Sequence, residues 1–254
     1  MKVTGKVVAV TGGAKGIGRA LARRFAHEGA RHVAIADLDG AGAQAAAREV
    51  NGSSARVDVR NEGEIRDFIE RTEREVGPID LFCSNAGIGV GRGLETPNEV
   101  WQTIWEVNLM AHVYAARCLV PRMIARGGGY LLNTASAAGL LSQIGSVTYA
   151  VTKHAAVSLA EWIALTHAHE GVKVSVLCPQ AVRTDMIAGA EGDVASVNGI
   201  LEPEQVAEAV IQGLEAEKFL ILPHSQVAEY MQLKAADRDR WIAGMNRLQR
   251  RYGA

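Results

Sequence analysis

The stretch Val7-Val-Ala-Val-Thr-Gly-Gly-Ala-Lys-Gly-Ile-Gly18 decides the fold of this 254-residue chain. Its first four residues are apolar and mostly β-branched, which is typical of a strand buried on both faces of a parallel sheet. Four glycines fall within the next eight residues, and a helical pattern then continues to Gly29. A strand, a glycine-rich turn and a helix in this order predict the first half of a dinucleotide-binding βαβ unit.

At three of these positions, glycine is expected for a different physical reason each time. Gly12 permits a tight turn, Gly16 lets the backbone approach a pyrophosphate, and Gly18 allows the helix to pack closely on the strand. The helix N-terminus then presents free N–H groups and the positive end of its dipole to the phosphates. The alternative is an ordinary glycine-rich turn that holds no ligand.

Asp37 ends the second predicted strand, His32–Asp37, about 20 residues beyond the glycines. A carboxylate there accepts hydrogen bonds from both ribose hydroxyls of adenosine and repels a 2′-phosphate, so NAD is expected and NADP is less favoured. The alternative is that Asp37 caps the next helix. Lys15 and Arg19 would favour a phosphate, but we give the acid at the ribose more weight.

Further short runs of strand type follow, separated by helical patterns. They are Ser54–Val59, Ile79–Cys83, Gly129–Thr134, Val172–Cys178 and Phe219–Pro223. The chain is therefore predicted to be α/β, a single doubly wound Rossmann-type domain over residues 1–254 with about seven parallel strands and helices on both faces. Within it, residues 185–200 are expected to form a substrate lid. Residues 225–254 are expected to form a helical extension that closes over the pocket or contacts another subunit.

Polar residues at or near the carboxyl ends of these strands are candidate ligand contacts, because open α/β sheets bind ligands at that edge. Asp58 either accepts the adenine amino group or caps the helix that begins near Glu62. Asn85-Ala86-Gly87 follows the fourth strand. Asn108 lies among apolar neighbours in a long helical stretch from about Pro97 to Arg126, where a buried amide needs partners. Those partners are either a functional group or a neighbouring helix.

Tyr149 and Lys153 are four residues apart, so on a helix they share one face. An ammonium close to a phenol favours the phenolate and lowers the phenol pKa from about 10. A tyrosine tuned in this way acts as general acid or base on an alcohol or carbonyl oxygen. Ser136 follows the fifth strand and would donate a hydrogen bond to the same oxygen. On an exposed helix, by contrast, such a pair is usually only a solvated face.

Composition excludes several classes of protein. Lys plus Arg is 27 and Asp plus Glu is 28, and this balance favours neither nucleic acid nor an anionic membrane surface as a partner. The cysteines, Cys83, Cys118 and Cys178, are too widely spaced for a metal cluster, so no metal is expected. With no signal-peptide pattern and no apolar run of about 20 residues, a cytoplasmic protein is expected.

The chain resembles the classical short-chain dehydrogenases/reductases over essentially its whole length. The matching motifs are Thr11-Gly12-x-x-x-Gly16-x-Gly18, Asp58, Asn85-Ala86-Gly87, Asn108, Ser136, Tyr149-x-x-x-Lys153 and Pro179-x-x-Val182-x-Thr184. Each motif is weak alone, but the order and spacing together are specific. The chain departs from the family pattern at Gln180, where glycine is usual, which makes the pocket narrower or more polar, and at Ser84, where asparagine is common.

The resemblance implies a role for each matching residue. Tyr149 would be the catalytic acid/base, Lys153 would lower its pKa and bind the nicotinamide ribose, Ser136 would polarise the substrate oxygen, and Asn108 would maintain a water-linked proton relay to Lys153. Cofactor contacts are expected from Gly12, Lys15, Gly16, Ile17, Gly18, Asp37, Leu38, Asp58, Val59, Asn85, Ala86, Gly87, Tyr149, Lys153, Pro179, Val182 and Thr184.

These observations predict an oxidoreductase that transfers a hydride reversibly between NAD(H) and a secondary alcohol or ketone. The substrate is expected to be a largely hydrophobic small molecule, because the predicted pocket residues Leu140, Leu141, Ile144 and Met186 are apolar. The sequence shows no obvious arginine clamp for an anionic group, and the candidates for one are Arg92 and Arg183. Surplus apolar positions on the helices that carry Asn108 and Tyr149 indicate that part of them packs on another subunit. The resemblance implies a homo-oligomer, a tetramer or a dimer. The alternatives are a catalytically silent NAD(H)-binding sensor and a related lyase or dehalogenase without net redox change.

Overall fold

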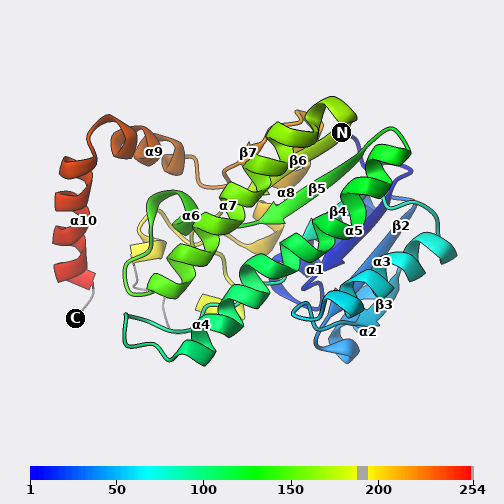
Figure 1. The fold of residues 1–254 in the computed structure, drawn as a ribbon, viewed down its shortest axis with the longest axis horizontal. Coiled ribbons are helices and arrows are strands. Elements are labelled where there is room, and N and C mark those ends of the chain that lie inside the picture. The colour runs from blue at the N-terminus through cyan, green and yellow to red at the C-terminus, as the bar shows by residue number, and fades with distance from the viewer. Residues whose placement is uncertain (188–193, 253–254) are drawn as a thin grey trace.

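The computed structural model describes residues 1–187 and 194–252. Its centre is one seven-stranded, all-parallel sheet with the order β3-β2-β1-β4-β5-β6-β7 (Figure 1). The strands are β1 (Val7–Thr11), β2 (His32–Asp37), β3 (Ser53–Arg56), β4 (Leu81–Ser84), β5 (Gly129–Thr134), β6 (Val172–Leu177) and β7 (Leu220–Ile221). The order changes direction between β1 and β4, and such a switch point opens a crevice at the carboxyl ends of the strands.

Helices cover both faces of the sheet, which confirms the predicted Rossmann-like fold. They are α1 (Gly16–His27), α2 (Gly40–Glu49), α3 (Glu62–Glu75), α4 (Asn98–Trp105), α5 (Ala111–Ala125), α6 (Ala138–Leu141), α7 (Val147–His167), α8 (Pro203–Glu215), α9 (Gln226–Ala236) and α10 (Arg238–Tyr252), with the short turns η1 (Glu106–Met110), η2 (Ala168–Glu170), η3 (Asp185–Ile187) and η4 (Val194–Ser196). One apolar core joins α3, α5 and α7 to the sheet, and a second joins α1, α2 and α8 to its other face.

The caps of α2 and α3 decide two alternatives left open by the sequence. Asp39 caps α2 by accepting the N–H of Gly42 at 3.0 Å. Asn61 caps α3 by accepting the N–H groups of Gly63 and Glu64. Asp37 and Asp58 are therefore not the capping residues, and both carboxylates lie at the edge of the sheet instead.

Three predicted elements differ from the structure. The third strand ends at Arg56 rather than at Val59, because Arg56 pairs with Asp37, the last residue of the neighbouring strand β2. The stretch from Pro97 to Arg126 is not one regular helix: a π-helical turn, η1, separates α4 from α5. The C-terminal extension contains two helices, α9 and α10, because the chain turns at Asp237.

Helix α9 is anchored to the body of the protein and α10 extends from it. Val227 of α9 packs with Ala137 and Leu141 near α6, while α10 stands at the far end of the molecule from β3 (Figure 1). The predicted lid is described only as η3 and as residues 194–200. Its residues 188–193, and residues 253–254 of the predicted extension, lie outside the described residues. None of the described helices is long and apolar enough to cross a membrane.

Candidate active site

A single cleft of about 2070 Å³ runs along the carboxyl ends of the strands from β2 to α10. It is lined by all but two of the predicted site residues: Gly12, Lys15, Gly16, Ile17, Asp37, Leu38, Asp58, Val59, Asn85, Ala86, Gly87, Ser136, Tyr149, Lys153, Pro179, Val182 and Thr184. Gly18 and Asn108 do not line it and lie behind its wall. The topology has therefore brought residues from the whole chain to one edge of the sheet.

The glycine-rich turn has the backbone shape that the sequence predicts. Gly12 (φ +65°) and Gly16 (φ +54°) both adopt the left-handed conformation. A Cβ on Gly12 would lie 2.8 Å from the Cα of Ala86, and one on Gly18 would lie 2.1 Å from the carbonyl oxygen of Gly12. Gly18 thus serves helix packing. No side chain caps the start of α1, so its first N–H groups are available to a phosphate.

Asp37 is held at the edge of this turn by two backbone donors. Its Oδ2 accepts the N–H of Ala14 at 3.0 Å, and its Oδ1 accepts the N–H of Asp39 at 3.0 Å. Each oxygen keeps acceptor capacity for a ribose hydroxyl. The nearby bases are paired with acids: Lys15 with Asp185 at 2.6 Å, and Arg19 with Glu49. Each of these two positive charges thus has a carboxylate beside it, and the Lys15–Asp185 pair is exposed.

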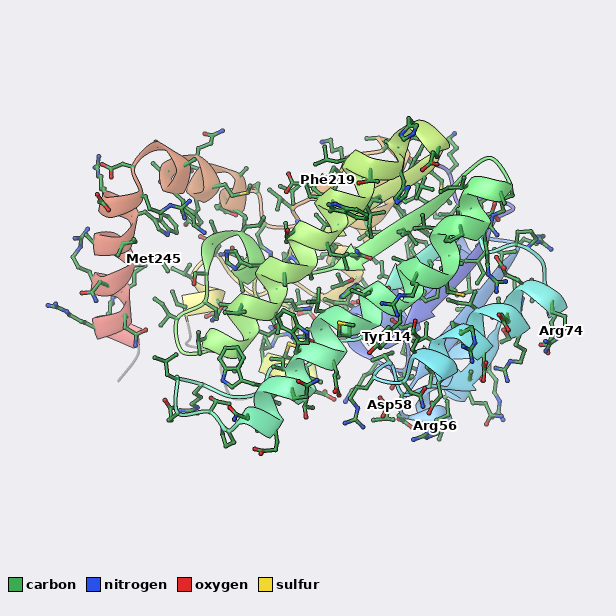
Figure 2. The ribbon with its side chains drawn as sticks, viewed as in Figure 1. Arg56, Asp58, Arg74, Tyr114, Phe219 and Met245 are labelled. Atoms are coloured by element: carbon green, nitrogen blue, oxygen red, sulfur yellow. The ribbon has the colours of Figure 1, made fainter. Side chains whose placement is uncertain are left out.

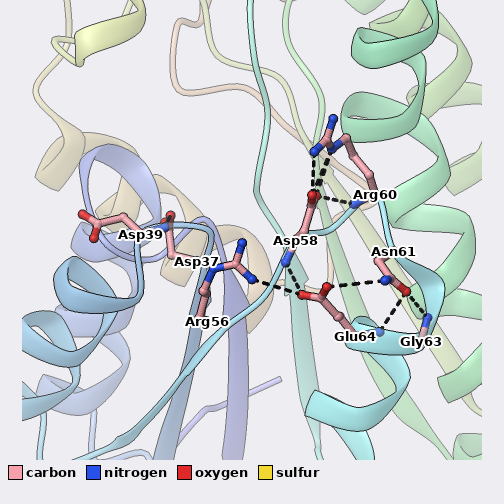
Figure 3. Close-up of polar contacts among 8 residues, drawn as sticks. All are labelled: Asp37, Asp39, Arg56, Asp58, Arg60, Asn61, Gly63 and Glu64. Carbon is pink, nitrogen blue, oxygen red and sulfur yellow. Dashed lines mark hydrogen bonds and ion pairs between the residues drawn. The ribbon is translucent and has the colours of Figure 1, made fainter.

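Asp58 is paired with an arginine that the sequence analysis overlooked. The Arg60 guanidinium donates to both Asp58 oxygens, at 3.0, 3.1 and 2.6 Å, and holds the pKa of this carboxyl below its usual range (Figure 3). The Asp58 N–H donates to Glu64. The charged carboxylate faces the cleft, and its contact with adenine stays a prediction.

Asn85 ties three strand ends together beneath the turn. Its Nδ2 donates to the carbonyls of Thr11 and Gly12, and its Oδ1 accepts from the Thr134 hydroxyl at 3.1 Å. The Thr11 hydroxyl accepts the N–H groups of Asn85 and Ala86. The sequence analysis assigned neither threonine a role, although Thr11 ends β1 and Thr134 ends β5, on either side of β4. The network fixes the floor of the cleft.

The far wall of the cleft follows β6. The carbonyl of Pro179 accepts the N–H of Ala137 at 2.8 Å and lies 3.4 Å from the Ser136 hydroxyl. Val182 forms a parallel bridge with Leu201, and Thr184 places its methyl group against Gly16. This wall connects the start of the predicted lid to the glycine-rich turn.

Ser136, Tyr149 and Lys153 meet at the middle of the cleft. Lys153 is only 2% exposed, its Nζ donates to the Thr134 carbonyl at 3.1 Å, and it lies 5.6 Å from the centroid of the Tyr149 ring. Burial lowers the pKa of Lys153 to about 8. Burial also raises the pKa of Tyr149, partly opposed by the Ser136 hydroxyl. The expected net lowering of the phenol pKa is therefore wrong for this arrangement, because desolvation of the phenol is the largest influence on it.

Asn108 lies in the π-helical turn and is completely buried. Its Oδ1 accepts the Ile88 N–H at 2.9 Å, and its Nδ2 donates to the Ile88 carbonyl at 2.9 Å and to the Thr152 hydroxyl at 3.2 Å. The interhelical bond considered from the sequence is thus present. A Cβ on Gly87 would lie 3.3 Å from Lys153 Nζ and 3.4 Å from Asn108 Oδ1. The absence of a side chain at Gly87 keeps the space between these two groups open.

The chain is similar to known dehydrogenases in sequence and structure. Residues 6–194 match the family described as short chain dehydrogenase. The chain belongs to the short-chain dehydrogenase family. It is 35% identical over 240 residues to 1-deoxy-11-beta-hydroxypentalenate dehydrogenase of Streptomyces exfoliatus, covering 89% of this chain and 85% of that one. It is 32% identical over 250 residues to D-beta-hydroxybutyrate dehydrogenase of Rhizobium meliloti, covering 94% of this chain and 95% of that one.

A solved structure agrees with this short-chain dehydrogenase assignment. A short chain dehydrogenase/reductase from Burkholderia phymatum in complex with NAD has a TM-score of 0.84 and 27% identity, covering 94% of this chain and 96% of that one. As a short-chain dehydrogenase, the chain is an oxidoreductase of hydroxyl and carbonyl groups, and its family binds a nicotinamide cofactor. Among the described residues, no group of three or more His, Cys, Asp or Glu side chains could hold a metal ion.

Proposed function

We propose that this chain catalyses reversible, NAD(H)-dependent hydride transfer between a secondary alcohol and a ketone of largely hydrophobic character. The observation that carries the proposal is the meeting of Ser136, Tyr149 and Lys153 in the same cleft as the glycine-rich turn and Asp37. A proton-transfer group and a dinucleotide cradle are the two parts that such a reaction requires from a protein.

The residues of the cleft fit a nicotinamide dinucleotide. Gly12 and Gly16 present bare backbone to a pyrophosphate, and the uncapped start of α1 offers N–H donors. Asp37 supports NAD over NADP, because its carboxylate suits ribose hydroxyls and repels a phosphate. Bound there, the cofactor supplies or accepts the hydride.

We propose that Tyr149 exchanges the proton with the substrate oxygen and that Ser136 donates a hydrogen bond to the same oxygen. Lys153 places a positive charge 5.6 Å from the phenol ring and stabilises the phenolate. A water-linked proton relay would reach Lys153 through the space next to Asn108. This space stays open because Gly87 has no side chain.

An apolar substrate is supported by the part of the cleft beyond Tyr149. Its apolar lining residues come from α6, the lid and the C-terminal helices: Leu141, Ile144, Met186, Val194, Val197, Leu233, Trp241, Met245 and Leu248. Met245 projects from α10 in Figure 2, and Trp241, Met245 and Leu248 share one face of that helix. Because apolar walls discriminate poorly against isosteres, size rather than charge would decide which alcohols enter.

The test is a panel of ketones and secondary alcohols assayed with NADH and NADPH side by side, with Tyr149→Phe as the variant. We expect turnover with NADH and its loss in Tyr149→Phe, with NADH binding retained. A Tyr149→Phe enzyme that keeps most of its kcat would disprove the assignment. Tight NADH binding with no turnover of any substrate would instead favour a silent sensor.

We also propose a homo-oligomer, as the sequence predicts. Trp162 is 59% exposed and Leu165 is 78% exposed on α7, and Trp105 on α4 is 36% exposed. Large apolar side chains on packed helices are typical of subunit contacts. Light scattering of the wild type and of Leu165→Arg measures this directly, and a monomeric wild type would reject it. The cytoplasmic location stays a prediction.

A further inference from the structure

Gln180 follows Pro179 at the end of β6, beside the residues proposed to act on the substrate oxygen. Its backbone N–H donates to Nδ1 of His224 at 3.2 Å, and His224 is only 3% exposed. The preceding carbonyl, that of Pro179, contacts Ser136 and Ala137. These hydrogen bonds to His224, Ser136 and Ala137 hold the backbone at Gln180 in place, and Gln180 lines the cleft.

A chain of hydrogen bonds connects the Gln180 side chain to α9. The Tyr230 hydroxyl donates to Asn198 Oδ1 at 3.1 Å, and Asn198 Nδ2 donates to Gln180 Oε1 at 2.9 Å. Three segments far apart in the sequence contribute to this series of hydrogen bonds: the residues after β6, the residues after η4, and α9. Because each step uses one donor and one acceptor, the orientation of the Gln180 amide is set by its neighbours.

With Oε1 engaged by Asn198, the Nε2 donors are the remaining polar group of a residue that lines the cleft. No residue in the described ranges accepts a hydrogen bond from this nitrogen, whereas the amide oxygen is engaged. This nitrogen remains accessible to water in the cleft, and a substrate oxygen can replace that water as the acceptor. The chain of bonds consists of an amide, an amide and a phenol, so it presents a neutral donor rather than a charge. Burial lowers the pKa of His224, which keeps that imidazole neutral too.

We propose that Gln180 is a specificity-determining residue that donates a hydrogen bond from Nε2 to a second, neutral oxygen of the substrate. The substrate class is therefore a hydrophobic alcohol or ketone that carries a further carbonyl or hydroxyl group near the reacting carbon. This inference rests on the proposed alcohol/ketone oxidoreduction and adds to it a polar subsite in an otherwise apolar pocket. Asn198 and Tyr230 act as positioning residues for the amide.

The experiment compares kcat/KM for methyl ketones of equal chain length, one unsubstituted and the others with a second carbonyl at successive positions. For wild type, we expect one dicarbonyl to exceed the unsubstituted ketone by about five- to tenfold, as one net hydrogen bond provides. Gln180→Ala should bring that ratio close to one. Gln180→Glu should do so as well, because it keeps the acceptor for Asn198 but has no donor.

Two further variants keep the test independent of any folding defect. Tyr230→Phe removes the first donor of the chain and should reduce the preference only in part. Gln143→Ala is the matched control, because the Gln143 amide also lines the cleft but donates to the Ile144 carbonyl, so the preference should stay at the wild-type value. Thermal unfolding of each variant checks the fold.

Three results would overturn the inference. The first is a wild type that turns over the unsubstituted ketone yet prefers no dicarbonyl. The second is a preference that survives in both Gln180→Ala and Gln180→Glu. The third is a wild type that turns over no ketone or alcohol at all, and this result alone would also reject the proposed function.

Discussion

Replacing Lys153 by methionine is the most informative perturbation of the proposed mechanism. The variant keeps an unbranched side chain of similar length and removes the ammonium 5.6 Å from the centroid of the Tyr149 ring. With an effective dielectric constant of about 20, a unit charge at this distance stabilises the phenolate by about 3 kcal/mol. That energy corresponds to a rise of roughly 2 units in the pKa of Tyr149 when the charge is lost.

The assay is the pH dependence of kcat/KM for oxidation of a secondary alcohol between pH 6 and 10. Only the phenolate accepts the hydroxyl proton, so the rising limb should move roughly 2 units toward higher pH in Lys153→Met. At pH 7 this shift predicts a rate loss on the order of 100-fold. The advantage of the wild type over Lys153→Met in kcat/KM should decrease above about pH 8, where Lys153 itself loses its proton.

Lys153→Arg is the control for the charge, and fluorescence titration of NADH is the control for cofactor binding. The arginine variant should restore part of the pH profile, because it returns a positive charge to the same helix position. A Lys153→Met enzyme whose profile coincides with the wild type while NADH binding is unchanged would show that the charge does not act on Tyr149. The electrostatic argument would then be refuted.

Three other predictions follow from the same cleft. Because burial holds the pKa of Lys153 near 8 against an ordinary 10.5, the unfolded chain binds more protons between these values. Wild-type stability relative to Lys153→Met should therefore rise with pH across that window, by up to about 3 kcal/mol in urea unfolding; a flat difference would contradict the burial of an ionised lysine. Asp37→Ser should raise the NADPH/NADH ratio of kcat/KM at least roughly tenfold by removing the repulsive carboxylate, and an unchanged ratio would reject its role in cofactor choice. Gly87→Ala should lower kcat about tenfold at saturating cofactor, because its Cβ would crowd Lys153 and Asn108 at 3.3 and 3.4 Å; an unchanged kcat would show that the space between them is not used.

The fold could be predicted because its local signals agree with its long-range packing. Val7–Val10 is apolar without interruption and is buried on both faces, and the glycines that follow are those whose missing side chains the structure needs. The predicted ends of β2 and β5, at Asp37 and Thr134, coincide with the observed ends. Parallel strands then bring their carboxyl ends to one edge, which gathers the site.

What the sequence could not predict depends on contacts between distant segments. The pairing of Asp58 with Arg60 is local, but an acid near a strand end equally well predicts a helix cap or an adenine ligand, so the spacing does not identify the partner (Figure 3). The contact of Gln180 with Asn198 joins residues 18 positions apart, and that of Asn198 with Tyr230 joins residues 32 apart. No periodicity reports such pairs. The raised pKa of Tyr149 depends on burial, which also becomes known only once the chain is folded.

The π-helical turn η1 has a consequence for the spacing of this whole region. A regular α-helix advances about 100° per residue, so one additional residue in a turn rotates all that follows by that angle relative to what precedes it. Deleting one residue between 106 and 110 would leave the sheet, the glycine-rich turn and α7 intact. It would nevertheless turn α4 by roughly a quarter of a circle against α5 and carry Asn108 away from Ile88 or Thr152. The extra residue of the π-helical turn thus sets the rotation of α4 relative to α5.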